Sequence, residues 1–177
     1  MNATVNRITP VHRGRVFRLV TENITLSNGV RVDIDVIRHP GAAAIVPLMG
    51  GQTVLLLRQY RHAVGGWIWE IPAGTLASQE SVEVCARREL TEETGYTARD
   101  LEKLGEITPL PGYADERIHL FLASGLTPSA QNLDADELLS VHPTPLPRAV
   151  EIILNGEIQD AKTITGLLLA ERRLQNA

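Results

Sequence analysis

The chain has 177 residues, is 44% hydrophobic and 21% charged, and carries a formal net charge of −4. This length suits one domain with a sizeable core, and the composition is that of a globular chain and not of a disordered one. Mild acidity argues against a protein that coats nucleic acid, because such a protein needs a basic surface.

The expected compartment follows from features that the sequence lacks. A single cysteine, Cys85, excludes an intrachain disulfide as well as Cys₄ and Cys₂His₂ zinc sites. No apolar run approaches the ~20 residues of a membrane span. The segment MNATVNRITP lacks the charged-then-apolar pattern of a signal peptide. We therefore expect a cytoplasmic protein that binds neither membrane nor nucleic acid.

The first 40 residues are predicted to form antiparallel strands. Residues 30–36, VRVDIDV, alternate apolar and charged side chains, as a half-buried strand does. Asn28 and Gly29 before them form a strong hairpin-turn signal, so a partner strand is expected over residues 16–26. The sequence thus predicts an N-terminal β-hairpin or sheet over residues 1–40, followed by a second domain over residues 41–177.

The second segment begins with strands and then alternates with helices. Short apolar runs bounded by turn residues predict buried strands, here over residues 42–49, 53–61 and 67–74. A helix is predicted over residues 82–94, between the cap Ser81 and the stop Gly95.

The order of the remaining elements decides the fold class. Three more strands and then two helices are predicted, over residues 103–110, 117–123, 137–142, 147–154 and 160–174, the helices beginning near Pro147 and Asp160. This order lacks the βαβαβ alternation of a doubly wound parallel sheet. It predicts an α+β protein or an α/β/α sandwich with a mixed sheet.

Three glutamates lie three and four residues apart on the middle helix, at Glu89, Glu92 and Glu93. Like charges at this spacing repel one another by a few tenths of a kcal/mol, roughly, per pair. If Val82, Ala86 and Leu90 face the core, the glutamates border the buried face. A hard divalent cation such as magnesium would relieve that repulsion, because it prefers oxygen ligands.

The helix belongs to a longer motif over residues 74–96, GTLASQESVEVCARRELTEETGY. This stretch satisfies G-x5-E-x7-R-E-U-x-E-E-x-G-U, where U is a bulky apolar residue. Seven fixed residue types match by chance in roughly 10⁻⁹–10⁻⁸ of windows. The motif resembles the signature of the Nudix hydrolases at Gly74, Glu80, Arg88, Glu89, Leu90, Glu92, Glu93, Gly95 and Tyr96.

The resemblance implies a Nudix α/β/α sandwich that hydrolyses a nucleoside diphosphate linked to another group. By position, Glu89, Glu93 and the Ala73 carbonyl would be metal ligands, with Glu92 a ligand or a neighbour of the ligands. Mg²⁺, or Mn²⁺, is implied, with more than one ion expected.

Two further positions of the motif would support the metal ligands. Arg88 would orient the carboxylates in catalysis, and Glu80 would brace the loop through hydrogen bonds. The alternative for these two residues is a surface ion pair worth little.

Segments outside the motif resemble the ADP-ribose pyrophosphatase branch of the family. They are RQYRHAVGGWIWEIPAG, PGYADERIHLFLA, DADELLSV and GEIQDAKTITGLL, and with the motif they cover most of residues 42–170. This branch implies hydrolysis of ADP-ribose to AMP and ribose 5-phosphate. Another nucleoside diphosphate sugar such as GDP-mannose, or a catalytically silent sensor of ADP-ribose, stays open as an alternative.

Several of these segments supply candidate substrate contacts. Arg58 and Arg61 are suited to phosphate oxygens. Trp69 shares a strand face with Trp67, and either could stack a base or ribose or pack in a core or dimer interface. Glu70 enters the candidate set from the EIPAG segment.

The acidic loop and the segment after residue 111 add two carboxylates. Glu137 is the candidate catalytic base, with Asp136 and Asp134 as rivals. Glu116 would contact the substrate or brace its loop. In the branch the N-terminal sheet joins two subunits, which implies a homodimer, although the first 40 residues match it weakly.

Overall fold

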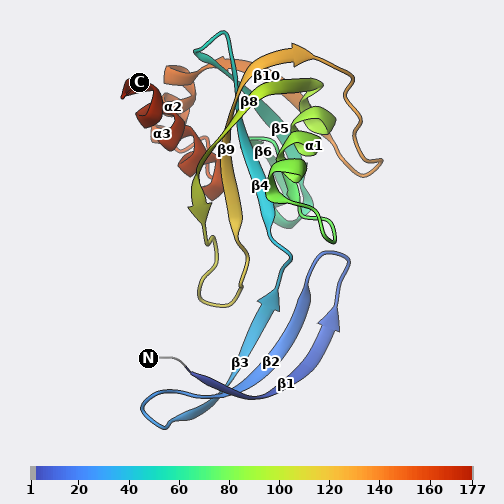
Figure 1. Cartoon of the computed structure of the whole chain (residues 1–177), viewed down its shortest axis with the longest axis vertical. Coiled ribbons are helices and arrows are strands. Elements are labelled where there is room, and N and C mark those ends of the chain that lie inside the picture. Colours follow the sequence, from blue (N-terminus) through green and yellow to red (C-terminus); the bar gives the residue numbers. More distant parts are fainter. Residues whose placement is uncertain (1–2, 177) are drawn as a thin grey trace. The chain divides into compact units, whose positions relative to one another are not determined.

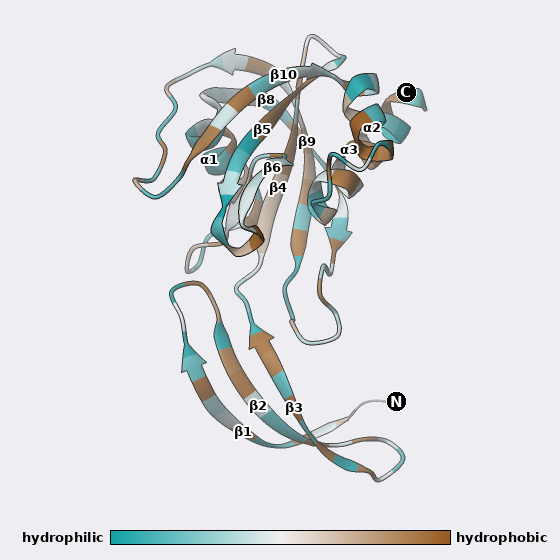
Figure 2. Cartoon of the chain, turned by 180° about the vertical axis from the view of Figure 1, so that it is seen from behind, coloured by the Kyte–Doolittle hydropathy of each residue, from teal (hydrophilic) through white to brown (hydrophobic). Residues whose placement is uncertain are grey.

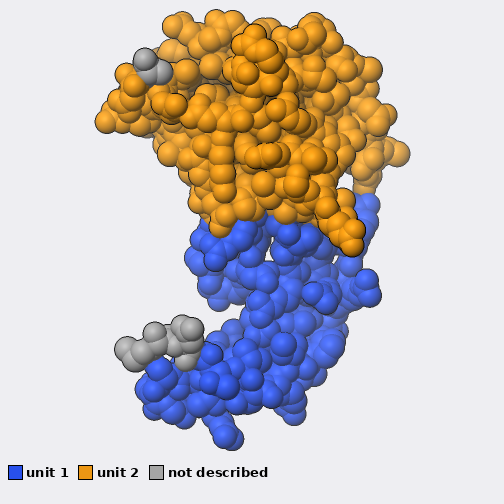
Figure 3. All heavy atoms as spheres, viewed as in Figure 1, with its two compact units in different colours: residues 1–41, 108–117 blue, residues 42–107, 118–177 orange. Residues whose placement is uncertain are grey.

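A computed structural model describes residues 3–176 of the chain and divides into two compact units (Figure 3). Unit 1 contains residues 1–41 and 108–117, and unit 2 contains residues 42–107 and 118–177. The grouping of residues 108–117 with the N-terminal strands was not foreseen from the sequence.

Unit 1 is a three-stranded antiparallel sheet in the order β1-β2-β3, with β1 over Thr4–Arg13, β2 over Arg18–Thr25 and β3 over Arg31–Arg38. The predicted turn joins β2 to β3, where Gly29 has a φ of 84° that favours glycine. Bands of hydrophobic and hydrophilic residues alternate along β2 and β3 (Figure 2). Strand β1 was not predicted separately, because two register shifts disturb its alternation and all its residues are exposed.

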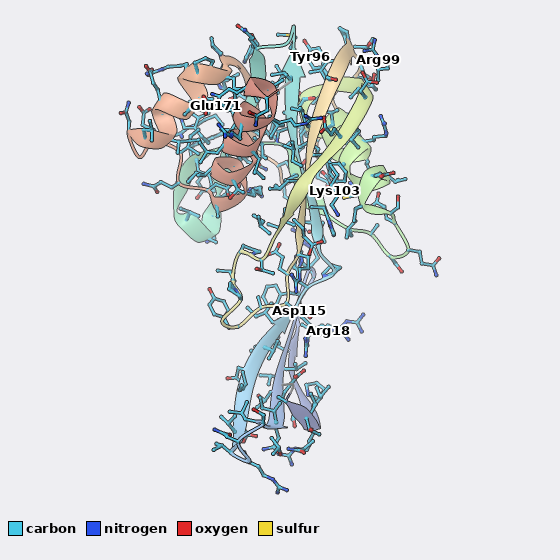
Figure 4. The ribbon with its side chains drawn as sticks, turned by 60° about the vertical axis from the view of Figure 1, so that its left-hand side comes forward. Arg18, Tyr96, Arg99, Lys103, Asp115 and Glu171 are labelled. Carbon is cyan, nitrogen blue, oxygen red and sulfur yellow. The ribbon has the colours of Figure 1, made fainter. Side chains whose placement is uncertain are left out.

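The segment 108–117 is attached to the end of β3. The Ile37 amide donates to the Tyr113 carbonyl at 2.8 Å, and the Asp115 amide donates to the Ile37 carbonyl at 3.1 Å. The Asp115 carboxylate accepts from Arg38 at 2.9 Å and from the His39 amide at 2.8 Å (Figure 4). Backbone and ionic contacts together hold this segment to unit 1.

Unit 2 is built on a seven-stranded mixed sheet. Its main path is β10-β5-β4-β9-β8, with β6 paired to β5 and β7 paired to β4. Strand β4 is parallel to β9, and the other pairs are antiparallel. The bounds are β4 Ala42–Met49, β5 Thr53–Arg61, η1 His62–Val64, β6 Gly66–Glu70, β7 Ala73–Thr75, α1 Val82–Thr94, β8 Tyr96–Ile107, β9 Ile118–Pro128, β10 Leu139–Pro145, α2 Leu146–Leu154 and α3 Ala161–Gln175.

The helices cover opposite faces of this sheet (Figure 1). Helices α2 and α3 pack on the larger apolar cluster, which includes Leu56, Leu120 and Leu167. Helix α1 packs on the smaller cluster, which includes Ile45, Leu90 and Phe121. The predicted α/β/α sandwich with a mixed sheet is confirmed.

Local capping fixes the helix ends as predicted. The Ser81 hydroxyl accepts from the Val84 amide at 3.3 Å, and Gly95 ends α1 with a φ of 73°. The Asp160 carboxylate accepts from the Thr163 amide at 3.0 Å and begins α3. Within the described residues, no helix is long and apolar enough to cross a membrane.

Candidate metal and diphosphate site

Helix α1 buries two of its three motif glutamates. Glu89 is 8% exposed and Glu93 is 1% exposed, whereas Glu92 is partly exposed. The sequence predicted that these charges border the core, and the structure places Glu89 and Glu93 within the buried face itself. The buried residues of α1 are Cys85, Ala86, Glu89, Leu90, Glu93 and Thr94.

Gly74 makes room for the Glu89 carboxylate. A Cβ atom at residue 74 would lie 1.8 Å from Oε1 of Glu89 and 2.5 Å from its Oε2. No real side chain tolerates such distances, so the carboxylate lies directly against the backbone of the β7 strand. Residue 74 must therefore be glycine for Glu89 to occupy this position.

Arg88 links the carboxylates of α1 to the preceding loop. Its Nε and Nη2 donate to the two oxygens of Glu80, each at 2.9 Å. Its Nη1 donates to Glu89 at 2.6 Å and to Glu92 at 3.1 Å. The hydrogen bond from Arg88 lowers the pKa of Glu80 to about 2. The pair is bidentate and partly buried, unlike an isolated surface ion pair.

Glu93 lies in the most desolvated position of the cluster. One of its oxygens accepts from the Ala73 amide at 2.8 Å. Burial raises the pKa of Glu93 to about 8, although this hydrogen bond opposes the rise. Burial also raises the pKa of Glu89, with Arg88 acting in the opposite direction. Ionising both carboxylates together requires a nearby cation.

These residues fit a hard divalent cation. Among residues 3–176, no three His, Cys, Asp or Glu side chains already converge as an ion site. Arg88 and the Ala73 amide donate hydrogen bonds to the carboxylates of α1. Oε2 of Glu89 and Oε1 of Glu93 accept no hydrogen bond from the described residues. Two such oxygens on adjacent buried carboxylates form a donor set suited to magnesium or manganese.

The acidic loop places Glu137 within electrostatic range of the cluster. Oε2 of Glu137 accepts from the Asp134 amide at 2.9 Å, and the Glu137 amide donates to the Asp134 carbonyl at 3.0 Å. The charge of Glu137 contributes to the raised pKa of both Glu89 and Glu93. The backbone of Asp134 and the side chain of Glu137 thus close one turn of the loop, and the choice of Glu137 over Asp134 as the base stays a prediction. The choice between Glu137 and Asp136 stays a prediction.

The two arginines of RQYR face opposite sides of the sheet, because they lie three residues apart on β5. Nε of Arg61 donates to Oε2 of Glu70 at 2.8 Å, and the Arg61 charge counteracts the rise in the pKa of Glu93. Arg61 therefore lies on the side of the α1 carboxylates. Its predicted contact with substrate is untested but compatible with this position.

Arg58 and Trp69 lie together on the side of α2 and α3. The Arg58 guanidinium is 5.1 Å from the centre of the Trp69 ring, and Trp69 packs against the larger apolar cluster. Both residues line a cavity of about 330 Å³, together with Trp67 and residues 156, 157 and 159. The sheet separates them from Glu89 and Glu93, so their predicted substrate contacts stay predictions.

Glu70 and Lys162 form a contact that the sequence reasoning missed. Lys162, in the first turn of α3, donates to Oε1 of Glu70 at 2.6 Å and to Asp160 at 3.0 Å. The Glu70 side chain is only 4% exposed, and both of its oxygens already have cationic partners. The sequence shows a lysine beside the helix cap in the segment DAKT, but only the fold brings this lysine to Glu70.

Two other side chains complete the account of the candidate residues. Glu116 belongs to unit 1, where its carboxylate lies 3.7 Å from Nδ1 of His39, and its substrate role stays a prediction. Gln59, the second residue of RQYR, is 2% exposed, and its Oε1 is buried without a hydrogen bond among the described residues.

Residues 38–165 match the NUDIX domain family. The chain belongs to the Nudix family. An ADP-ribose pyrophosphatase of Bacillus subtilis (strain 168) is 37% identical over 155 residues, covering 86% of this chain and 84% of the relative. The methanol dehydrogenase activator of Bacillus methanolicus is 38% identical over 156 residues, covering 87% and 84%.

A solved structure agrees with the family assignment over nearly the whole chain. The crystal structure of an ADP compounds hydrolase superposes with a TM-score of 0.87 at 25% identity, and covers 99% of this chain and 96% of its own. The Nudix fold is thus shown, and the chain is an enzyme of the Nudix pyrophosphatase class, as the sequence predicted.

Proposed function

We propose that this Nudix enzyme hydrolyses the diphosphate of ADP-ribose to AMP and ribose 5-phosphate, with magnesium as its cofactor. The observation that carries the proposal is the buried pair Glu89 and Glu93. The Glu89 carboxylate lies against Gly74 and Arg88, and the Glu93 carboxylate accepts from the Ala73 amide. On a solvated surface these carboxylates would be exposed, and in an apolar core two unpaired charges would destabilise the fold. Similarity to an ADP-ribose pyrophosphatase supports the choice of substrate.

In this proposal each residue of the cluster has a separate task. Glu89, Glu93, Glu92 and the Ala73 carbonyl would hold the cation, and Arg88 keeps the carboxylates oriented. When bound, a divalent cation neutralises the diphosphate and activates a water molecule.

The bond changes follow from the roles of the side chains. Glu137 accepts a proton from the attacking water, whose oxygen forms a bond to one phosphorus while the bridging phosphorus–oxygen bond breaks. Arg61 steadies the departing phosphate through its Nη atoms. No protein side chain needs to become covalently attached to phosphorus.

A panel of substrates tests the proposal directly. ADP-ribose, GDP-mannose and other nucleoside diphosphate sugars are assayed with magnesium, and kcat/KM values are compared. We expect ADP-ribose to rank first, a chelator to abolish turnover and added magnesium to restore it. Turnover that survives chelation would refute metal dependence, and a higher rank for GDP-mannose would move the substrate assignment to that sugar.

A regulatory role is a second candidate, because one relative is named as an activator of a dehydrogenase. In that case the Nudix site would act on a partner or on its cofactor while the carboxylate cluster stays the same. A dehydrogenase assay separates the candidates: a higher dehydrogenase rate in the presence of this protein favours the regulator. Hydrolysis of ADP-ribose with no effect on the dehydrogenase rate favours the simple enzyme.

We also infer that two copies pair through unit 1. Strand β1 exposes Val5, Ile8 and Val11, each at least half accessible, on a sheet that has a free edge. Such an edge presents unpaired backbone groups with which a strand of another chain can pair. Light scattering of the wild type should give twice the chain mass, and Ile8→Glu should shift it toward the single-chain mass.

A further inference from the structure

Arg61, Glu70, Lys162 and Asp160 form a chain of alternating charges from the surface to the start of α3. The side chains of Glu70, Lys162 and Asp160 are 4%, 12% and 17% exposed, whereas that of Arg61 is 40% exposed. The arginine is therefore the member of the chain that is most open to solvent. The other members are supports behind it.

The two oxygens of Glu70 have different partners. Oε2 accepts from Nε of Arg61 at 2.8 Å, and Oε1 accepts from Nζ of Lys162 at 2.6 Å. A guanidinium facing a free carboxylate ordinarily takes both oxygens through a two-pronged contact. Lys162 bonds the second oxygen, and among the described residues Arg61 contacts Glu70 through Nε alone.

Both Nη atoms of Arg61 are available, because they make no hydrogen bond to the described residues, and the Arg61 side chain is 40% exposed. The Arg61 charge also counteracts the pKa rise of Glu93, which places the group on the side of the α1 carboxylates. The geometry suits a phosphate held beside those carboxylates.

Lys162 is itself held from two sides. Its ammonium also bonds Asp160 at 3.0 Å, and Asp160 caps α3 through the Thr163 amide and hydroxyl. The Thr163 hydroxyl in turn accepts from the Ile71 amide at 2.9 Å, next to Glu70 in the chain. The start of α3 is thus fixed to the segment that carries Glu70.

We propose that Lys162 is a positioning residue that keeps Arg61 singly bonded to Glu70, so that both Nη atoms of Arg61 bind a substrate phosphate. This inference rests on the proposed function, because it assigns Arg61 to the diphosphate. It also gives Glu70 an indirect role, through Arg61, in place of a direct contact with substrate.

Lys162→Met tests the inference, since methionine keeps the aliphatic stem and removes the charge. Oε1 of Glu70 then recruits an Nη atom of Arg61, and one phosphate contact is lost. We expect kcat/KM to fall about tenfold, mainly through a higher KM, as the loss of one charge-assisted hydrogen bond implies. Lys162→Arg should restore kcat/KM to within about threefold, because it returns a cation to Oε1.

Leu167→Ala is the control for stability, because it destabilises α3 from within the larger apolar cluster and removes no group of the charged chain. It should lower the melting temperature and leave kcat/KM within about twofold. A loss of kcat/KM in Leu167→Ala equal to that in Lys162→Met would show that Lys162 acts only through stability. That result overturns the inference.

A double-mutant cycle with Arg61→Ala tests whether Lys162 affects the substrate through Arg61. In the Arg61→Ala background, Lys162→Met should change kcat/KM by less than about twofold. A full tenfold effect in that background refutes the route through Arg61.

Calorimetric binding of ADP-ribose in chelator adds a measurement that does not depend on turnover, and Lys162→Met should weaken it about tenfold. If the wild type binds or hydrolyses ADP-ribose but Lys162→Met is normal, only this inference fails. If the wild type does neither with any nucleoside diphosphate sugar, the proposed function fails, and the inference fails with it.

Discussion

Helix α1 and helix α3 cover opposite faces of the same sheet, but they bury different kinds of side chain. Helix α3 contributes Leu167 and Ala170 to the larger apolar cluster. Helix α1 contributes Leu90 to the smaller cluster and also buries Glu89 and Glu93. Apolar burial favours folding, whereas unpaired buried charge opposes it. From the comparison we predict that the buried apolar side chains of α3 serve stability and that the buried carboxylates of α1 serve chemistry.

The largest effect is expected on the α1 face, from Glu93→Gln. Turnover should fall about 10²–10³-fold, because the substitution removes a carboxylate that the proposed function assigns to the cation. The melting temperature in chelator should stay equal or rise, since the neutral side chain avoids burying a charge. Activity assays and thermal unfolding measure the two quantities. Activity within twofold of the wild type would refute the metal assignment.

Glu137→Gln should lower kcat about 10²-fold and affect substrate affinity less, as expected for a general base. Asp136→Asn is the control on the same loop, and we expect it to keep most of the activity. Steady-state kinetics of both variants check the assignment. The reverse ranking would transfer the base role to Asp136.

On the α3 face, Leu167→Ala should lower the free energy of unfolding by about 2–4 kcal/mol, because it leaves a cavity in the larger cluster. Turnover per folded molecule should be unchanged at a temperature where the variant is folded. Denaturant unfolding and active-site-normalised kinetics check both statements. A large loss of kcat in the folded variant would contradict the separation between the two faces.

The smallest effect concerns the pH dependence of stability near Arg88. The pKa of Glu80 is lowered to about 2 in the folded state, so its ion pair stabilises the fold above the unfolded pKa of about 4.5. This contribution should disappear as the pH falls from 4.5 toward 2. Glu80→Gln should therefore flatten the decline of melting temperature over that range. An unchanged slope would show that the pair adds nothing to stability.

The sequence predicted the parts of the fold whose signals are local. Strands β4 and β5 begin and end where their apolar runs meet turn residues, and Ser81 and Gly95 bound α1. The start of β8 was missed, because its first residues are polar and become a strand only by pairing with β9. The start of this strand is set by tertiary pairing and not by a local pattern of apolar residues.

The candidate site shows the same division between local and distant information. The α1 carboxylates and Arg88 lie within one motif, so their proximity follows from helix spacing. The contact between Glu70 and Lys162 spans 92 residues and depends on how α3 docks. The opposite directions of Arg58 and Arg61 follow from the period of a strand, and that signal was present but not used.

The close approach of Glu89 to the backbone of residue 74 allows the site to be changed without altering a charged residue. Gly74→Ala adds one methyl group where the carboxylate lies and leaves every charged side chain in the chain intact. We expect such a variant to be inactive while it keeps the net charge of the native enzyme. It would allow crystallisation with an unhydrolysed nucleotide. Inside a cell, it would separate the effects of hydrolysis from the effects of the folded protein itself.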